Sequence, residues 1–405
     1  MMVTFIHTWS HFPLAGLRAR SLDGELARTV EREPARTLGS SWGVALAVGL
    51  LVISWPTSGR AWPAQRRGWS RPGNLGIVAS RFGSARSVLV RPGLLRRFYH
   101  MPRQYLPGEY RLPAVLRDRP GMWNGVADSV LQRRIQRDRI VRITVNHGGS
   151  SVSLRLYFAD GASAAFKPEQ SFIQSVPRKE IAAYLVNRLL GFARVPPATY
   201  RVITVRELFS KLESARWKRR WIRKSIRADG HGRLAGEVSW WIPKIAHIPL
   251  EKWTFRKRWH QWIKAYKRLP RRHYRMSAQI SVLLVFDFLI NNMDRLSGWN
   301  VCGTPDWGRL YFMDNTMSFF AQPKGTKTAR TGLERVQRFS RRLFRNLKKM
   351  SESRLRAELS AYVDAPWPLL TDREIEMLMA RRDYVLRYMH QMIARYGWQR
   401  TMVYP

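Results

Sequence analysis

Two aspartates in the second half of the chain have the types and the spacing that phosphate and metal chemistry needs. The first, Asp294, lies with Asn300 in a polar loop after the apolar run 281–290, and a short predicted strand, 309–313, leads to Asp314. A loop aspartate can accept a proton from an attacking hydroxyl, while an asparagine and a second aspartate can hold a divalent metal against phosphates. For each residue alone the alternative is an ordinary turn residue, because Asx side chains favour turns.

A lysine that completes this set lies upstream, at the end of a predicted β-hairpin. Residues 151–158 alternate between apolar and polar side chains, and Asp160 with Gly161 indicates a two-residue turn. A turn of that length places Lys167 on the second strand opposite Leu154, and so on the apolar face of the sheet. The alternative is an exposed lysine at the end of a strand.

The residues around this lysine suit a nucleotide. Ala165 lies two positions before Lys167 and therefore shares its face. A small residue and a lysine beneath an apolar sheet surface fit an adenine ring and its α- and β-phosphates. Gly148 and Gly149 precede the hairpin, and their backbone N–H groups can approach phosphate, although a plain turn is the favoured interpretation of this pair.

A predicted helix over 178–190 follows, with apolar residues at helical spacing. Gly191 suits the position after its last turn, and two prolines prevent its continuation. Glu180 lies in the first turn, where the helix dipole favours a carboxylate. The alternative is that Glu180 pairs with Lys167 or contacts the metal.

In four segments the chain resembles the secretory-pathway kinases, which include the Golgi casein kinase, the proteoglycan xylose kinase and the four-jointed proteins. The segments are AAFKP, EIAAYLVNRLLGFARVPPATYRV, VFDFLINNMDR and FMDNTMSFF, in this order. The resemblance covers about residues 141–393 and is weak over 208–275.

The resemblance implies an α+β, atypical protein-kinase-like bilobal fold, in which a small sheet-rich N-lobe covers a mostly helical C-lobe. It also implies ATP and Mn²⁺ or Mg²⁺ in the cleft between the lobes. By position, Lys167 holds the nucleotide phosphates and Glu180 is the glutamate of the small-lobe helix. Asp294 is the catalytic aspartate, and Asp314 is the metal aspartate that stands where ordinary kinases carry the aspartate of DFG.

The loop after Asp294 departs from the family pattern. Members often carry histidine two residues after the catalytic aspartate, and many carry asparagine five residues after it. Here these positions hold Leu296 and Trp299, and Asn300 comes one residue later. The metal role of Asn300 therefore rests on a loop that is one residue longer, and a catalytically inactive pseudokinase or activator is the alternative to an enzyme.

Charge is the most unusual feature of the composition. Lys and Arg number 71 against 28 Asp and Glu, for a net charge of +43. Such a field attracts polyanions, including acidic proteins and anionic glycans. The segment 216–224 interleaves Trp217 and Trp221 with basic residues, as a single-strand nucleic-acid binder would. A solvated basic surface is the favoured interpretation, and a polyanion-binding protein on a kinase scaffold remains the second alternative.

The N-terminal region bears on localisation. Residues 42–55 form an apolar run that is short for a bilayer span and typical of a signal-peptide core. Gly59 and Ala61 offer small residues for a signal peptidase, while the positive flank downstream disfavours translocation. Export or membrane anchoring is favoured over a cytoplasmic location. A lone cysteine, Cys302, excludes an internal disulfide.

These features predict three regions and one function. Residues 1–61 are a signal-like or anchor-like region, and 62–125 are an Arg/Pro/Gly-rich linker or arm. Residues 126–400 are the kinase-like domain, with its N-lobe at about 126–245 and its C-lobe at about 246–400. The predicted function is ATP-dependent transfer of a γ-phosphoryl group to a hydroxyl of an acidic protein or a glycan.

Two structural expectations complete the prediction. Asp287 precedes Asp294 by seven residues on a predicted helix, and we expect it to bond to backbone or to a basic residue near the loop. Thr371 and Glu374 form a predicted capping box that opens a long helix, with Gly397 at its end.

Overall fold

The computed structural model describes residues 119, 121–146, 150–297 and 300–405. Its first part contains most of the strands: β1 (Met122–Trp123), β2 (Val126–Ala127), α1 (Asp128–Arg137), β3 (Ile140–Val145), β4 (Leu154–Phe158), β5 (Ser163–Pro168), α2 (Arg178–Leu189), β6 (Ala198–Thr204), α3 (Val205–Lys211), β7 (Leu212–Glu213), α4 (Arg216–Ser225) and β8 (Arg233–Trp240).

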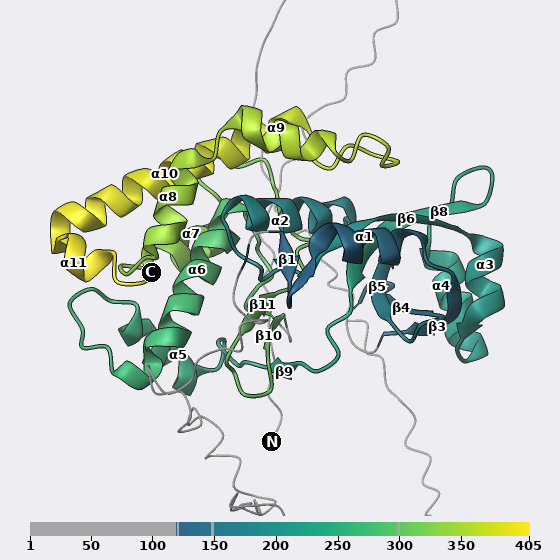
Figure 1. Cartoon of the computed structure of the whole chain (residues 1–405), viewed down its shortest axis with the longest axis horizontal. Coiled ribbons are helices and arrows are strands. Elements are labelled where there is room, and N and C mark those ends of the chain that lie inside the picture. Colours follow the sequence, from purple (N-terminus) through teal and green to yellow (C-terminus); the bar gives the residue numbers. More distant parts are fainter. Residues whose placement is uncertain (1–118, 120, 147–149, 298–299) are drawn as a thin grey trace, which may run out of the picture. The chain divides into compact units, whose positions relative to one another are not determined.

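The second part is mostly helical (Figure 1). Its elements are β9 (Ala246–His247), α5 (Trp253–Trp262), a 3₁₀ turn (Arg271–His273), α6 (Tyr274–Leu289), β10 (Val301–Gly303), β11 (Leu310–Phe312), α7 (Lys327–Glu334), α8 (Arg341–Lys349), α9 (Glu352–Ser360), α10 (Asp372–Tyr396) and α11 (Trp398–Thr401). The division into a sheet-rich part and a helical part agrees with the predicted fold class.

The first part is built on a six-stranded sheet with the order β6-β8-β5-β4-β3-β7, antiparallel except for the β3–β7 pair. One face carries a continuous apolar cluster, to which α1 contributes Ile135, α3 contributes Leu208 and Phe209, and α4 contributes Ile222. These three helices therefore cover one face. The side chains on the other face are not covered by these helices, and they line the candidate site described below.

The register of the β4–β5 hairpin differs from the prediction and changes which residues line that second face. Leu154 pairs with Phe166, so Lys167 lies on the face opposite the apolar side chains of β4, and its expected position among them was wrong. The turn contains three residues rather than two, because the N–H of Phe158 donates to Ala162 O at 2.9 Å and Gly161 adopts a φ of +83°. A shift of one residue moves every side chain of a strand to the other face.

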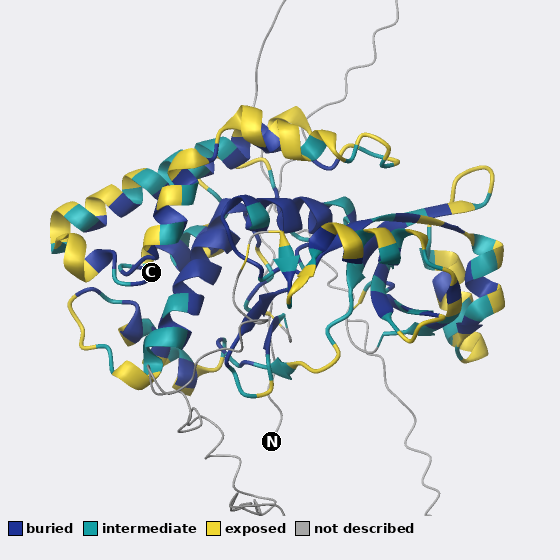
Figure 2. Cartoon of the chain, in the orientation of Figure 1, coloured by how far each residue is buried: buried dark blue, intermediate teal, exposed yellow. Residues whose placement is uncertain are grey.

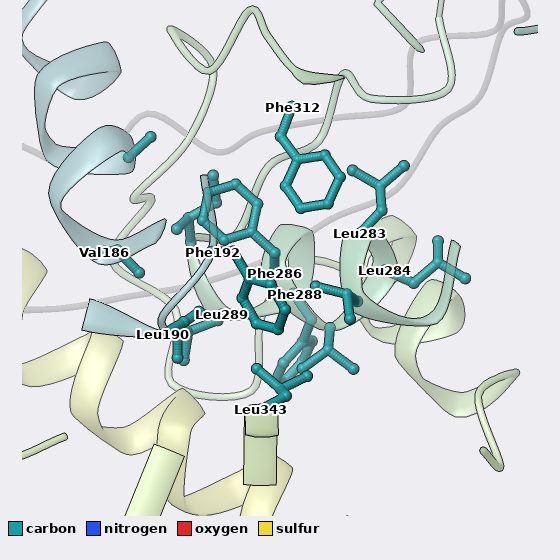
Figure 3. Packing of buried hydrophobic residues seen from close by; sticks show 14 of the residues in the cluster. Val186, Leu190, Phe192, Leu283, Leu284, Phe286, Phe288, Leu289, Phe312 and Leu343 are labelled. Atoms are coloured by element: carbon teal, nitrogen blue, oxygen red, sulfur yellow. The ribbon is translucent and has the colours of Figure 1, made fainter. Parts of the chain in front are cut away.

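The core of the helical part centres on α6, which is buried along nearly its whole length (Figure 2). Phe286, Phe288 and Leu289 from this helix pack with Val186 of α2 and Leu343 of α8 (Figure 3). Because one end of α6 leads directly into the loop of Asp294, this rigid core fixes where the loop begins.

The ends of α2 and α10 follow the predicted rules. Gly191 has a φ of +80° just after α2, a conformation that favours glycine, and a Cβ at this position would also force the side chain of Asn346 to shift. Thr371 and Glu374 form the expected capping box at the start of α10, and Gly397 with a φ of +79° ends that helix. Both predicted helices are confirmed.

Several predictions fall outside the described residues. They concern the regions 1–61 and 62–118, the glycines Gly148 and Gly149, and Trp299. The signal-like run 42–55 is among them, and the predicted domain boundaries stay predictions. Within the described ranges, no helix combines the length and the apolar character that crossing a bilayer requires.

Candidate active site

Lys167, Glu180 and Asp314 meet on the polar face of the six-stranded sheet. The Nζ of Lys167 lies 2.9 Å from Oε1 of Glu180 and 2.8 Å from Oδ1 of Asp314. The lysine and glutamate side chains are 14% and 9% exposed, whereas that of Asp314 is 44% exposed. Three elements therefore converge here: β5 with Lys167, the first turn of α2 with Glu180, and the segment after β11 with Asp314. Glu180 pairs with Lys167 and also occupies the helix position that favours a carboxylate.

The electrostatics of this cluster keep Lys167 and Asp314 charged. Burial by itself would lower the pKa of Lys167, but the carboxylates of Asp314 and Glu180 outweigh it and raise that pKa above its ordinary value. The same ammonium lowers the pKa of Asp314. Asp314 therefore offers an ionised and accessible carboxylate, the type of oxygen ligand that Mg²⁺ and Mn²⁺ prefer.

Asp314 also has a strained backbone. Its φ is +57°, a left-handed conformation that costs energy for residues with a side chain, although Asp and Asn tolerate it best. The next residue explains how the conformation is held: the N–H of Asn315 donates to Oε1 of Glu180 at 2.8 Å, and its side-chain Nδ2 donates to Oε2 at 3.0 Å. The turn after β11 is thus tied directly to α2.

Arg295 extends these contacts to the catalytic-loop candidate. Its Nη2 donates to Oδ1 of Asn315 at 2.6 Å, and its Nε lies 3.0 Å from Oδ1 of Asp287. Both Arg295 and Asp287 are buried. The expectation that Asp287 bonds to a basic residue near the loop is confirmed, and Arg295 holds the loop, α6 and the segment after β11 in one arrangement.

Asp294 is half-buried at the edge of this network. Its N–H donates to Oδ1 of Asn292 at 2.9 Å, while Nδ2 of Asn292 donates to the carbonyl of Asp314 at 3.4 Å. One oxygen of the Asp294 carboxylate accepts from Oγ of Ser297, and the other accepts from Nδ2 of Asn300 at 3.0 Å. Asn300 thus contacts the candidate base, and its predicted metal role stays a prediction.

The structure adds Glu237, which the sequence analysis did not identify. Glu237 on β8 pairs in register with Lys167 and is 1% exposed. Its Oε1 is buried and has no hydrogen-bond partner among the described residues. In the sequence, Glu237 is only an acidic residue among apolar ones, in the segment 208–275 where the resemblance to the secretory-pathway kinases is weak. Three carboxylates therefore surround the single ammonium of Lys167.

The charge balance predicts an effect on stability. Burial, together with the nearby charge of Glu180, raises the pKa of Glu237 from 4.5 to about 8. The folded protein therefore binds a proton that the unfolded chain releases near pH 4.5. The stability that this proton contributes is complete below pH 4.5 and lost as the pH rises through about 8.

At pH 9 we expect the melting temperature of the Glu237→Gln variant, whose side chain stays neutral, to exceed that of the wild type by a few degrees. Each kcal/mol of unfolding free energy raises the melting temperature of a domain of this kind by about 2–4 °C. The difference should shrink as the pH falls to 5. Melting curves in EDTA across this range measure it, with Glu358→Gln, an exposed carboxylate on α9, as the control. A constant difference at all pH values would contradict the assignment.

The basic cluster 216–224 forms most of α4, of which only Ile222 is buried. Trp217 and Trp221 are 67% and 37% exposed. Arg219 instead donates to the carbonyls of Phe209 and Leu212, and so secures α3. Part of the cluster is thus structural, and nucleic-acid binding by the rest stays a prediction.

No protein-family model matches the chain, and no curated protein matches its sequence. Among solved structures, the chain is similar to the Golgi casein kinase, with 17% identity, a TM-score of 0.53, and coverage of 67% of this chain and 76% of that one. The same enzyme with Mn and ADP bound gives 17% identity, a TM-score of 0.55, and coverage of 68% and 78%. Hydra Fam20 with a sugar gives 17% identity, a TM-score of 0.50, and coverage of 67% and 90%.

These similarities establish the fold. The chain has the atypical kinase fold of the Golgi casein kinase and Fam20 proteins. The predicted fold class and the resemblance stated from the sequence segments are therefore confirmed at the level of architecture.

Proposed function

We propose that the protein is an ATP-dependent phosphotransferase that moves the γ-phosphoryl group to a hydroxyl of a protein or glycan acceptor, with the help of a divalent metal. The observation that carries this proposal is the contact of Lys167 with both Glu180 and Asp314 in a kinase fold. The neighbour solved with Mn and ADP supports the same ligands for this chain.

The donor atoms present fit a divalent cation. Asp314 is ionised and partly exposed, so its carboxylate oxygens can act as metal ligands. A metal bound there supplies charge neutralisation to the nucleotide phosphates. Lys167 donates to phosphate oxygens from Nζ, and Glu180 keeps that ammonium in place. Asp294 accepts the acceptor hydroxyl's proton on its carboxylate, which Ser297 and Asn300 orient.

The acceptor and the location of the protein are further parts of the proposal. A net charge of +43 favours an acidic acceptor, either an acidic protein or an anionic glycan. Export or membrane anchoring is supported by the signal-like run 42–55 and by the secretory-pathway character of the Golgi casein kinase. Salt should weaken acceptor binding steeply, because exposed charges are screened.

A thermal-shift series with ATP, Mg²⁺ and Mn²⁺, followed by an assay of Mn²⁺-dependent ATP consumption, tests the proposal. A ligand that binds only the native form raises the melting temperature, so ATP with metal should raise it more than either does alone. Binding without consumption would favour the pseudokinase, which the presence of Leu296 and the longer loop motivate. If nothing binds, while polyanion affinity survives Lys167→Ala, the scaffold alternative is favoured.

A further inference from the structure

Arg155 lies on the polar face of the sheet, and the proposed mechanism gives it no role. Arg155 on β4 pairs in register with Ala165 of β5, and its Nη2 donates to Oγ of Ser163 on the same neighbouring strand at 3.0 Å. Its Cζ lies 4.6 Å from the ring centroid of Tyr157 and 4.2 Å from that of Trp241. The guanidinium therefore contacts an aromatic ring of its own strand and one that follows β8.

This arrangement is costly for a purely structural arginine. Among the described residues no carboxylate pairs with Arg155, and its Nε is buried without a hydrogen-bond partner. A guanidinium that lacks both a counter-ion and a full set of acceptors has lost hydration without full compensation. Stacking on aromatic rings offsets only part of that cost.

Arg155 lies where the base of a nucleotide bound at Lys167 can reach. Lys167 and Asp314 define the phosphate end, and β5 ends at Pro168, one residue beyond the lysine. Along β5 itself, the strand surface for the rest of a nucleotide therefore lies in the other direction, past Ala165 towards Ser163. These residues are two and four positions from Lys167, or roughly 7 and 13 Å along a strand. Arg155 spans this stretch.

The contact between Arg155 and Trp241 leaves no room for a base. Two flat groups 4.2 Å apart are already in stacking contact, and a third planar group between them needs a separation of roughly 7 Å. Resting on the proposed function, we infer that Arg155 stacks on the nucleobase, which takes the place that the Trp241 ring occupies beside the guanidinium. Trp241 thus competes with the nucleotide for the guanidinium.

Two variants and two ligands test this inference. Arg155→Lys keeps the charge but loses the planar guanidinium, and Trp241→Leu removes the competing ring. The ligands are ATP and inorganic tripolyphosphate, which has the phosphates but no base, each titrated calorimetrically with Mn²⁺. Lys167→Ala is the reference variant, because it should weaken both ligands.

We expect Arg155→Lys to weaken ATP about tenfold and to leave tripolyphosphate unchanged, since only the base contact is lost. Trp241→Leu should tighten ATP roughly two- to fivefold, again with no effect on tripolyphosphate. Melting temperatures of the variants near that of the wild type show that the fold is kept.

Other outcomes overturn the inference in identifiable ways. If the wild type binds both ligands and Arg155→Lys binds ATP equally well, or loses both ligands in the same ratio, Arg155 does not contact the base. If Trp241→Leu weakens ATP, the tryptophan supports the base and does not compete with it. If the wild type binds neither ligand, the phosphotransferase proposal itself fails, and this inference fails with it.

Discussion

The Asp314→Ala variant should bind ATP in the presence of metal with an affinity about 100- to 1000-fold lower than that of the wild type, while its fold stays intact. A metal at this carboxylate contributes several kcal/mol, and each 1.4 kcal/mol corresponds to a tenfold change. The fold should survive, because Lys167 keeps its buried partner Glu180 at 2.9 Å. Calorimetric titration of ATP with Mn²⁺ into the variant, alongside a melting curve, measures both quantities.

The control for this loss is Asp364→Ala, which removes the same charge from an exposed loop. It should bind ATP and Mn²⁺ as the wild type does, so a general effect of net charge can be separated from a ligand effect. Wild-type ATP turnover by Asp314→Ala would show that the metal assignment is wrong.

The second large effect is expected from Asp294→Asn. This change keeps the size of the side chain, so its contacts with the loop are largely retained, but the amide cannot accept a proton. Phosphoryl transfer should fall by about two to four decades while ATP affinity stays within a factor of a few. Single-turnover transfer and an independent ATP titration separate the two quantities.

Ser297→Ala provides the matched comparison, because Ser297 orients the same carboxylate without being the proton acceptor. Its transfer rate should fall far less than that of Asp294→Asn. A parallel loss of ATP affinity in Asp294→Asn would count against the role of this aspartate as the base.

The candidate site was largely predictable where the sequence carries local signals. The helix that carries Glu180, the strand before Asp314 and the capping box of α10 were each predicted from periodicity and end residues. The convergence of Lys167 with Asp314 was predicted from the order of motifs, and the structure contains it. Roles in binding and catalysis at these positions stay predictions.

Other features could not be predicted, for two physical reasons. The face on which Lys167 lies depends on whether the turn at Gly161 has two or three residues, and both turn types use the same residues. Glu237 lies on β8, whose pairing with β5 is long-range, and Arg155 meets Trp241 only because Trp241 follows that strand. A polar residue in a strand indicates its environment only when its partner strands are known.

The two hydrogen bonds from Asn315 to the carboxylate oxygens of Glu180 have a consequence for how α2 can move. In many protein kinases, activity is switched off when the small-lobe helix swings away from the lysine. Here such a swing would break the bonds to Asn315 and the ion pair with Lys167 together, while Arg295 resists from the other side. Lys167, Glu180 and the turn that carries Asp314 should therefore move together or stay in place together, rather than separate one at a time.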